Sequence, residues 1–276
     1  MRGGSVAVVL FLTAAAPLTA GERKYDVGGF KLNLRCEGSG SPVVIFDSGA
    51  GDTLATWDWV APDLKKLTRV CAYDRAGIGK SDSGPRPRTS ERIVGELHEL
   101  LKRAHVPPPY VMVGHSFGGL NVRLYAARNP DQVSGLVLVD ATPEGYPAIE
   151  DSLRTPAERE KLRTVRAAAP GVFIDEIDAM PDSAASVRAA PLPPEIPVLI
   201  LTAAHRDDSP AFRSVWTDLQ RKMAATFAHV RQIKAEKSDH YIQFDEPELV
   251  VSAVSELVAA ARSRTARDPR GSSDSP

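Results

Sequence analysis

Hydrophobic and polar positions along the chain follow two periods, and these periods predict strands and helices in turn. Between residues 25 and 37, apolar and polar side chains alternate on either side of Gly28 and Gly29, which indicates two short strands joined by a turn. Continuous apolar runs are typical of strands buried on both faces of a parallel sheet. Such runs, or shorter strand patterns, lie at residues 43–46, 69–73, 110–113, 133–139, 196–202 and 230–233.

Helical spacing of apolar residues separates these runs. It predicts helices at residues 53–67, 92–104, 118–128 and 156–168, and a last helix after residue 241. Strands that alternate with helices favour the α/β class, with a mostly parallel sheet and helices on both faces. Residues 142–194 are polar, proline-rich and too long for a simple connection. We interpret them as a small helical cap inserted into the domain.

The two ends of the chain differ from its middle. Residues 1–21 combine Arg2, an apolar run and small residues up to Ala20, which predicts a secretory signal peptide and an exported protein, periplasmic or secreted. A retained membrane anchor is the alternative, but the strongly apolar part is shorter than the ~20 residues that a span needs. No stable membrane association is expected after cleavage. Residues 22–262 are then the domain, and residues 263–276, rich in Arg, Ser, Asp and Pro, are predicted to be a disordered tail.

Composition and charge indicate which kinds of binding partner to expect. Hydrophobic residues make up 43% of the 276 residues and charged residues 25%, which is ordinary for a soluble globular protein. Lys and Arg number 34 against 35 Asp and Glu, so the net charge of −1 gives no reason to expect nucleic acid. The two cysteines, Cys36 and Cys71, show no metal-ligand spacing. We expect a small-molecule substrate and no metal or other cofactor.

Candidate chemistry centres on Gly114-His115-Ser116-Phe117-Gly118, which matches the pattern G-x-S-x-G. The segment follows the strand at 110–113 directly and precedes the helix at 118–128 directly. A serine on so tight a strand-to-helix turn adopts a strained backbone and needs small neighbours, which the glycines provide. We predict Ser116 as a nucleophile; a glycine-rich turn with an incidental serine is the alternative.

A serine hydroxyl is a poor nucleophile unless a base takes its proton, and the chain offers six histidines. His240 stands on a polar loop before the last helix, which fits a chain order of serine, acid and histidine. His205 follows a strand and is a rival. The others lie in the turn beside Ser116, around an earlier helix or in a late amphipathic segment. We predict His240 as the general base.

Five segments carry a resemblance to a known family: residues 47–51 (DSGAG), 73–79 with Ser81 (YDRAGIG), 114–119 (GHSFGG), 137–140 (VLVD) and 239–248 (DHYIQFDEPE). Together they resemble the α/β-hydrolase superfamily, in a bacterial branch of serine hydrolases. The resemblance implies the α/β-hydrolase fold. It also implies an oxyanion hole formed by the backbone N–H groups of Phe117 and Ala50, although Gly49 and Gly51 alternatively serve only to make a turn. Residues 74–81 resemble a structural turn beside the sheet.

The acid that orients His240 stays open between two aspartates. Asp207 follows the strand at 196–202, where most of the family carries its acid, but the spacing after Thr202 is looser than the usual short turn. Asp140 ends the strand at 133–139, a position that a minority uses. We favour Asp140. The family's sheet order would also place Cys36 beside Cys71 on antiparallel strands, so a disulfide and two buried thiols are both open.

The function that follows is acyl transfer to water through an acyl-serine, on a small carboxylic ester. Amidases, peptidases, C–C hydrolases and cofactor-free perhydrolases share the same residues, and they remain alternatives. A non-catalytic binding protein on this fold is the rival from another class; it would be expected to have lost the serine or the histidine, and neither is lost.

Overall fold

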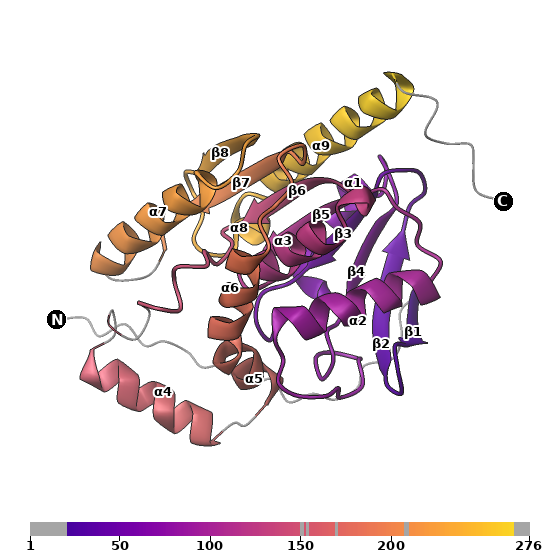
Figure 1. The fold of residues 1–276 in the computed structure, drawn as a ribbon. Helices are drawn as coiled ribbons and strands as arrows, with labels where there is room; N and C mark the ends of the chain where they lie inside the picture. Colours follow the sequence, from indigo (N-terminus) through magenta and orange to yellow (C-terminus); the bar gives the residue numbers. More distant parts are fainter. Residues whose placement is uncertain (1–20, 150–151, 153–154, 169–170, 207–209, 268–276) are drawn as a thin grey trace.

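From β3 onward, strands and helices alternate along the chain (Figure 1). The computed structural model describes residues 21–149, 152, 155–168, 171–206 and 210–267. The strands are β1 (Glu22–Asp26), β2 (Lys31–Glu37), β3 (Val43–Asp47), β4 (Val70–Tyr73), β5 (Tyr110–His115), β6 (Val133–Val139), β7 (Val198–Ala203) and β8 (Val230–Ala235). The helices are α1 (Ala61–Leu64), α2 (Ser90–Arg103), α3 (Gly118–Arg128), α4 (Pro156–Ala168), α5 (Val172–Asp178), α6 (Met180–Ala189), α7 (Pro210–Ala224), α8 (Ile242–Asp245) and α9 (Pro247–Arg267).

The strands form one sheet in the order β1-β2-β4-β3-β5-β6-β7-β8. β2 pairs antiparallel with β1 and β4, and all the other neighbours are parallel. This confirms the predicted α/β fold. After β3 the chain first forms β4 on one side and then returns to form β5 on the other. In open α/β sheets, ligands bind beyond the carboxyl ends of the strands at such a reversal, so the segments that follow β3 and β5 face the expected binding site.

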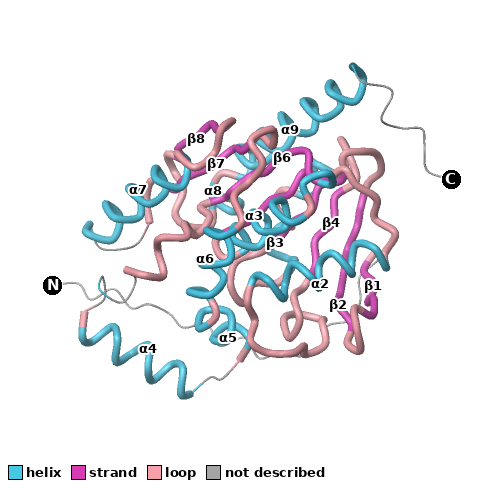
Figure 2. The backbone as a smooth tube through the Cα atoms, in the orientation of Figure 1, coloured by secondary structure: helices cyan, strands magenta, loops and turns pink. Residues whose placement is uncertain are grey.

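Two apolar layers cover the sheet because successive strand side chains point to opposite faces. Val43 and Ile45 of β3 belong to the core beneath α2, α3 and α6, whereas Val44 and Phe46 belong to the core beneath α1 and α9. Figure 2 shows the backbone of α2 and α3 in front of the sheet. Within the second core, the ring of Phe46 stacks on Trp57 with 4.6 Å between ring centroids. The site therefore rests on strands that are packed from both sides.

The insertion between β6 and β7 contains α4, α5 and α6, as the predicted helical cap requires. α5 lies against two glycines that follow the carboxyl ends of β3 and β4. A Cβ atom on Gly51 would lie 2.9 Å from the Phe173 ring, and one on Gly77 would collide with Val172. Both glycines also have positive φ, of 73° and 82°. Only glycine meets both demands there, so the cap seats directly on these two loops.

The structure corrects two predictions about helices in particular. The helix expected at residues 53–67 is broken into the 3₁₀ turn Leu54–Trp57 and the short helix α1. Asp74 accepts a hydrogen bond from Leu54 N–H and holds the turn, and a new helix begins at Ala61 with Pro62 in its first turn. At the other end, α9 runs to Arg267, so residues 263–267 of the predicted tail are helical. Arg264 anchors them by donating to Ser134 O at 2.6 Å.

The remaining tail and the predicted signal peptide, at residues 268–276 and 1–20, lie outside the described residues. Among the helices that are described, none combines the length and the apolar character that crossing a bilayer demands.

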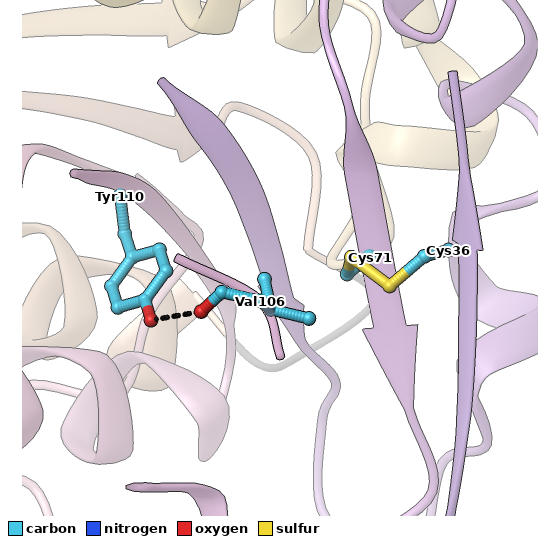
Figure 3. The surroundings of a disulfide bond; sticks show 4 residues. All are labelled: Cys36, Cys71, Val106 and Tyr110. Atoms are coloured by element: carbon cyan, nitrogen blue, oxygen red, sulfur yellow. Dashed lines mark hydrogen bonds between the residues drawn. A yellow bond between two sulfur atoms is a disulfide. The ribbon is translucent and has the colours of Figure 1, made fainter. Parts of the chain in front are cut away.

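Cys36 and Cys71 are joined by a disulfide that links β2 to β4 (Figure 3). The two residues are register partners on these antiparallel strands, so of the two states that the sequence left open, the structure has the bonded one. Nearby, the first residue of β5, Tyr110, donates its hydroxyl to Val106 O at 2.7 Å, as Figure 3 also shows. The disulfide thus fixes the antiparallel side of the sheet at its junction with the parallel part.

Replacing both cysteines with alanine is expected to lower the free energy of unfolding by about 4 kcal/mol. The bond closes a loop over a sequence separation of 35 residues, and its loss returns that loop entropy to the unfolded chain. Urea unfolding of the oxidised wild type and of the double variant measures the difference. Two free thiols on the denatured wild-type protein from an oxidising host would contradict the bond.

Candidate active site

Ser116 lies on a strained turn between β5 and α3. Its φ is +51°, in the left-handed region that residues other than glycine rarely adopt. Ser116 N–H donates to Val139 O at 3.2 Å, and Ser116 O accepts from Thr142 N–H at 2.9 Å. A Cβ atom on Gly114 would lie 2.6 Å from Gly118 O, so small neighbours are required. Backbone strain that the surroundings hold in place is typical of functional sites, so this turn is a candidate for one.

His240 is bonded to Asp140, one of the two candidate acids. His240 Nδ1 lies 2.7 Å from Asp140 Oδ2. The register between β5 and β6 pairs His115 with Val139, so Ser116 and Asp140 each stand just beyond the ends of neighbouring strands. Asp207, the other candidate, lies outside the described residues. The structure therefore gives His240 a carboxylate partner at Asp140.

Asp140 is fully buried, and its environment holds it ionised. Burial alone would raise its pKa, but the hydrogen bond from His240 and the charges of His240 and Arg206 outweigh this and hold the pKa at about 2. Its other oxygen, Oδ1, accepts from Trp216 Nε1 at 3.1 Å and from Ala203 N–H at 3.2 Å. A carboxylate held this way fixes an imidazole and stabilises its protonated form.

His115, the residue before Ser116, holds the His240 backbone. Its Nε2–H donates to His240 O at 3.0 Å, and the two imidazole centroids lie 4.6 Å apart. Burial lowers the pKa of His115 well below its usual value, which favours the neutral imidazole. The Ser116 hydroxyl makes no hydrogen bond to any residue in the described ranges. Catalytic hydrogen bonds in ligand-free enzymes often tighten only when substrate binds.

Two backbone N–H groups, those of Ala50 and Phe117, lie in the segments that follow β3 and β5. The loop after β3 lies against the start of α3, where Gly118 packs on Asp47 O. Neither Ala50 N–H nor Phe117 N–H donates to a residue in the part of the chain that the structure covers. Both belong to the segments at the carboxyl ends of β3 and β5, where the sheet topology places a ligand.

The comparison with protein families agrees with this geometry. The family model for the alpha/beta hydrolase fold matches residues 41–179, which hold the loop after β3, the serine turn, Asp140 and most of the cap. The chain belongs to the α/β-hydrolase family. A Bacillus subtilis relative, the uncharacterized protein YqjL, is 30% identical over 87% of this chain and 93% of its own length. The 2-(acetamidomethylene)succinate hydrolase of Mesorhizobium japonicum is 26% identical over 86% of this chain and 95% of its own.

Solved structures show the same α/β-hydrolase fold. The enol-lactonase from Burkholderia xenovorans superposes with a TM-score of 0.61 at 22% identity, and it covers 86% of this chain and 100% of its own. A thermophilic esterase from Thermogutta terrifontis gives 0.61 at 20% identity, with 88% and 99% covered. At this identity the likeness concerns the fold alone.

Arg206 is a site residue of this α/β-hydrolase that the sequence did not reveal. Its Nη1 lies 2.6 Å from Asp140 Oδ2 and 2.8 Å from His240 Nδ1, and its guanidinium lies over the Trp216 ring at 4.2 Å. A guanidinium only donates. It therefore bonds Nδ1 only when that atom is unprotonated, whereas the bond from Nδ1–H to Asp140 leaves Nε2 unprotonated in the neutral imidazole. Arg206 and Asp140 thus favour opposite tautomers of His240.

A buried ion cluster beneath the loop after β3 was also missed. Arg75 donates to Asp47 Oδ1 at 2.8 Å and to Glu176 Oε1 at 2.6 Å, and all three side chains are fully buried. Burial raises the pKa of Asp47, and the charge of Arg75 opposes that rise. The segment at 74–81 was interpreted as architecture; Arg75 within it joins the sheet, the loop and the cap.

The described residues were also compared for groups of side chains that could bind a metal ion. In those residues, His, Cys, Asp and Glu nowhere gather in a group of three or more that suits a metal ion.

Proposed function

We propose that this protein is a serine hydrolase in which Ser116 is the nucleophile, His240 the general base and Asp140 the acid that orients it. The observation that carries the proposal is the bond between His240 Nδ1 and Asp140 Oδ2 at 2.7 Å, one strand away from a serine with a φ of +51°. This combination supplies a strained, accessible hydroxyl and an oriented base at the sheet edge where the fold binds ligands.

In the acylation step, Ser116 Oγ attacks the carbonyl carbon of the substrate while His240 Nε2 takes the hydroxyl proton. Asp140 stabilises the imidazolium that forms, and the N–H groups of Ala50 and Phe117 bind the oxyanion. When the tetrahedral intermediate collapses, the bond from carbon to the leaving oxygen breaks. His240 gives its proton to that oxygen, which leaves as an alcohol and leaves an acyl-serine behind.

Deacylation repeats these roles with water as the nucleophile. His240 takes a proton from water as its oxygen attacks the acyl carbon, and the same two N–H groups bind the second oxyanion. Collapse breaks the bond to Ser116 Oγ, which recovers its proton from His240. The products are a carboxylic acid and the free enzyme, so the cycle consumes one water per ester.

Apolar surface beside the site favours an ester with a hydrophobic group. The partly exposed rings of Tyr241 and Phe244 stack at 5.2 Å directly after His240. Phe173 of the cap is also partly exposed, and it lies against Gly51 beside the proposed oxyanion donor Ala50. Aromatic side chains of this kind bind apolar parts of ligands.

A panel of p-nitrophenyl esters of graded acyl length, with matched p-nitroanilides, tests the substrate class. We expect turnover of the esters, with a preference for an apolar acyl chain over acetate. Faster cleavage of the anilides would replace the ester assignment with an amidase. The anilide series is included because one relative is named 2-(acetamidomethylene)succinate hydrolase. No turnover in either series would contradict the proposal.

We further propose that the protein is exported. The disulfide between Cys36 and Cys71 supports this, because such bonds persist in oxidising compartments. Cell fractionation of the native host with an antibody to the domain measures it, and recovery only from the cytosol would contradict it.

A further inference from the structure

The loop that carries the proposed oxyanion donor is held from below by one arginine. Arg75 Nη1 donates to Ser48 O at 2.8 Å, and Arg75 Nη2 donates to Gly49 O at 2.6 Å. The same guanidinium bonds Asp47 at the end of β3. The arginine therefore donates hydrogen bonds to three consecutive residues of this loop, and its planar guanidinium fixes the direction of each bond.

The direction of the Ala50 N–H follows from the two bonds to Gly49 O, which accepts from Arg75 Nη2 and also from Asp52 N–H at 3.1 Å. Gly49 C=O and Ala50 N–H belong to one peptide unit, which is planar and trans, so its N–H points opposite to its C=O. Because the carbonyl of Gly49 points at Arg75, the N–H of Ala50 points away from Arg75. The next peptide is tied as well, since Gly51 N–H donates to Glu176 Oε2 at 2.9 Å. Both peptides that flank Ala50 are thereby fixed, while its own N–H stays free.

Glu176 joins this arrangement to the cap. It lies on α5, and its two oxygens accept from Arg75 Nε at 2.6 Å and from Arg75 Nη2 at 2.9 Å. A fully buried carboxylate is costly unless it is paired and hydrogen-bonded, so Glu176 is stable there only while α5 sits on Arg75 and Gly51. Phe173, one turn earlier on α5, packs on Gly51.

We propose that Arg75 and Glu176 are positioning residues for the oxyanion hole, so that correct seating of α5 is a condition for catalysis. The inference rests on the proposed serine-hydrolase function. Neither side chain touches the reacting atoms in this scheme. They act through the peptides on either side of Ala50, and displacement of α5 removes the anchor of Gly51 and loosens Arg75.

Glu176→Gln tests the proposal, because it keeps the shape of the side chain and removes the charge that holds Arg75. We expect kcat on the best ester to fall by about 10- to 100-fold with KM little changed, less than the loss of a whole oxyanion donor. The decisive readout is the inhibition constant of a trifluoromethyl ketone, whose serine adduct carries an oxyanion, relative to a long-chain alcohol of the same length, which forms no adduct. We expect the inhibition constant of the ketone to rise in proportion to the fall in kcat, and that of the alcohol to stay unchanged.

Glu96→Gln is the matched control. Glu96 also forms a buried two-bond pair with an arginine, at 2.7 and 2.6 Å to Arg88, and in the described residues this pair makes no hydrogen bond to the loop after β3. The Glu96→Gln substitution should lower the melting temperature while leaving kcat and the ratio of the two inhibition constants unchanged. Arg75→Lys is the second test variant, because lysine keeps the charge but has no fork with which to hold Gly49 O and Glu176 together.

The outcomes separate this inference from the proposed function. Suppose that the wild type is active and that a folded Glu176→Gln or Arg75→Lys protein has the same ratio of ketone to alcohol inhibition constants as the wild type. This result would overturn the positioning role but not the proposed serine hydrolase. Equal weakening of ketone and alcohol, or the same change in Glu96→Gln, would also overturn it. A wild type that hydrolyses no ester and does not react with the ketone would overturn both.

Discussion

Ser116→Ala is expected to lower kcat on p-nitrophenyl esters by on the order of 10⁶-fold while the protein stays folded, because no other group replaces the hydroxyl in a serine-histidine-acid site. The residual rate would come from the oxyanion donors and substrate binding. Initial rates at saturating ester, together with the thermal unfolding of both proteins, measure the effect.

Ser134→Ala is the control for that experiment. Ser134 donates its hydroxyl to Tyr110 O at 2.9 Å, at the opposite end of β5 from Ser116. Its removal takes a serine hydroxyl from the same pair of strands and should leave kcat close to wild type. Near-wild-type activity in Ser116→Ala would rule out Ser116 as the nucleophile.

Asp140→Asn should lower kcat by about 10⁴-fold, as expected when a triad acid becomes an amide and the histidine adopts the wrong tautomer. Asparagine offers an N–H to His240 Nδ1, and it also removes the charge that balances Arg206, whose Nη1 lies 2.6 Å from Asp140 Oδ2. Both changes favour the tautomer of His240 that has no free Nε2 to accept the serine proton.

Asp207→Asn, measured beside it, should cost far less. The comparison decides between the two acids that the sequence left open. A large loss in Asp207→Asn with a mild one in Asp140→Asn would reverse the assignment, and equal mild losses in both would remove both acids from the mechanism.

Local pattern was enough to predict the serine turn. The strand, the glycines and the helix around Ser116 are consecutive in sequence, and each is recognised by a short period or a residue type with special backbone freedom. The positive φ of Ser116 follows from that local constraint. The buried runs of the parallel sheet were predicted for the same reason, with ends that differ from the structure by at most a few residues.

The local sequence pattern did not decide which aspartate contacts His240. Asp140 and Asp207 both follow strands of the parallel sheet, β6 and β7, which are neighbours. The carboxyl ends of these two strands therefore lie on the same edge of the sheet, so the strand order alone does not choose between the two acids. Which one contacts the imidazole depends on loop conformation, which sequence periodicity does not encode.

Residues that act across long distances in the chain gave no signal at all. Glu176 meets Arg75 across 101 positions, and Arg206 reaches Asp140 across 66. In sequence, an isolated Glu in a polar cap or an Arg after a strand resembles any solvated charge. Only the fold shows that these charges are buried together, which is why the ion cluster and the arginine beside the proposed base appear first in the structure.

The most direct measurement is the reaction of the purified protein with a fluorophosphonate, followed by mass spectrometry of its peptides. Such a reagent phosphonylates a serine that is activated by a neighbouring base and oxyanion donors. We predict one stoichiometric adduct on Ser116, formed in step with the loss of esterase activity and absent from Ser116→Ala. The assignment of this chain as a serine hydrolase would be contradicted if wild-type protein that hydrolyses esters formed no adduct. It would also be contradicted if the adduct formed on another residue and Ser116→Ala retained it.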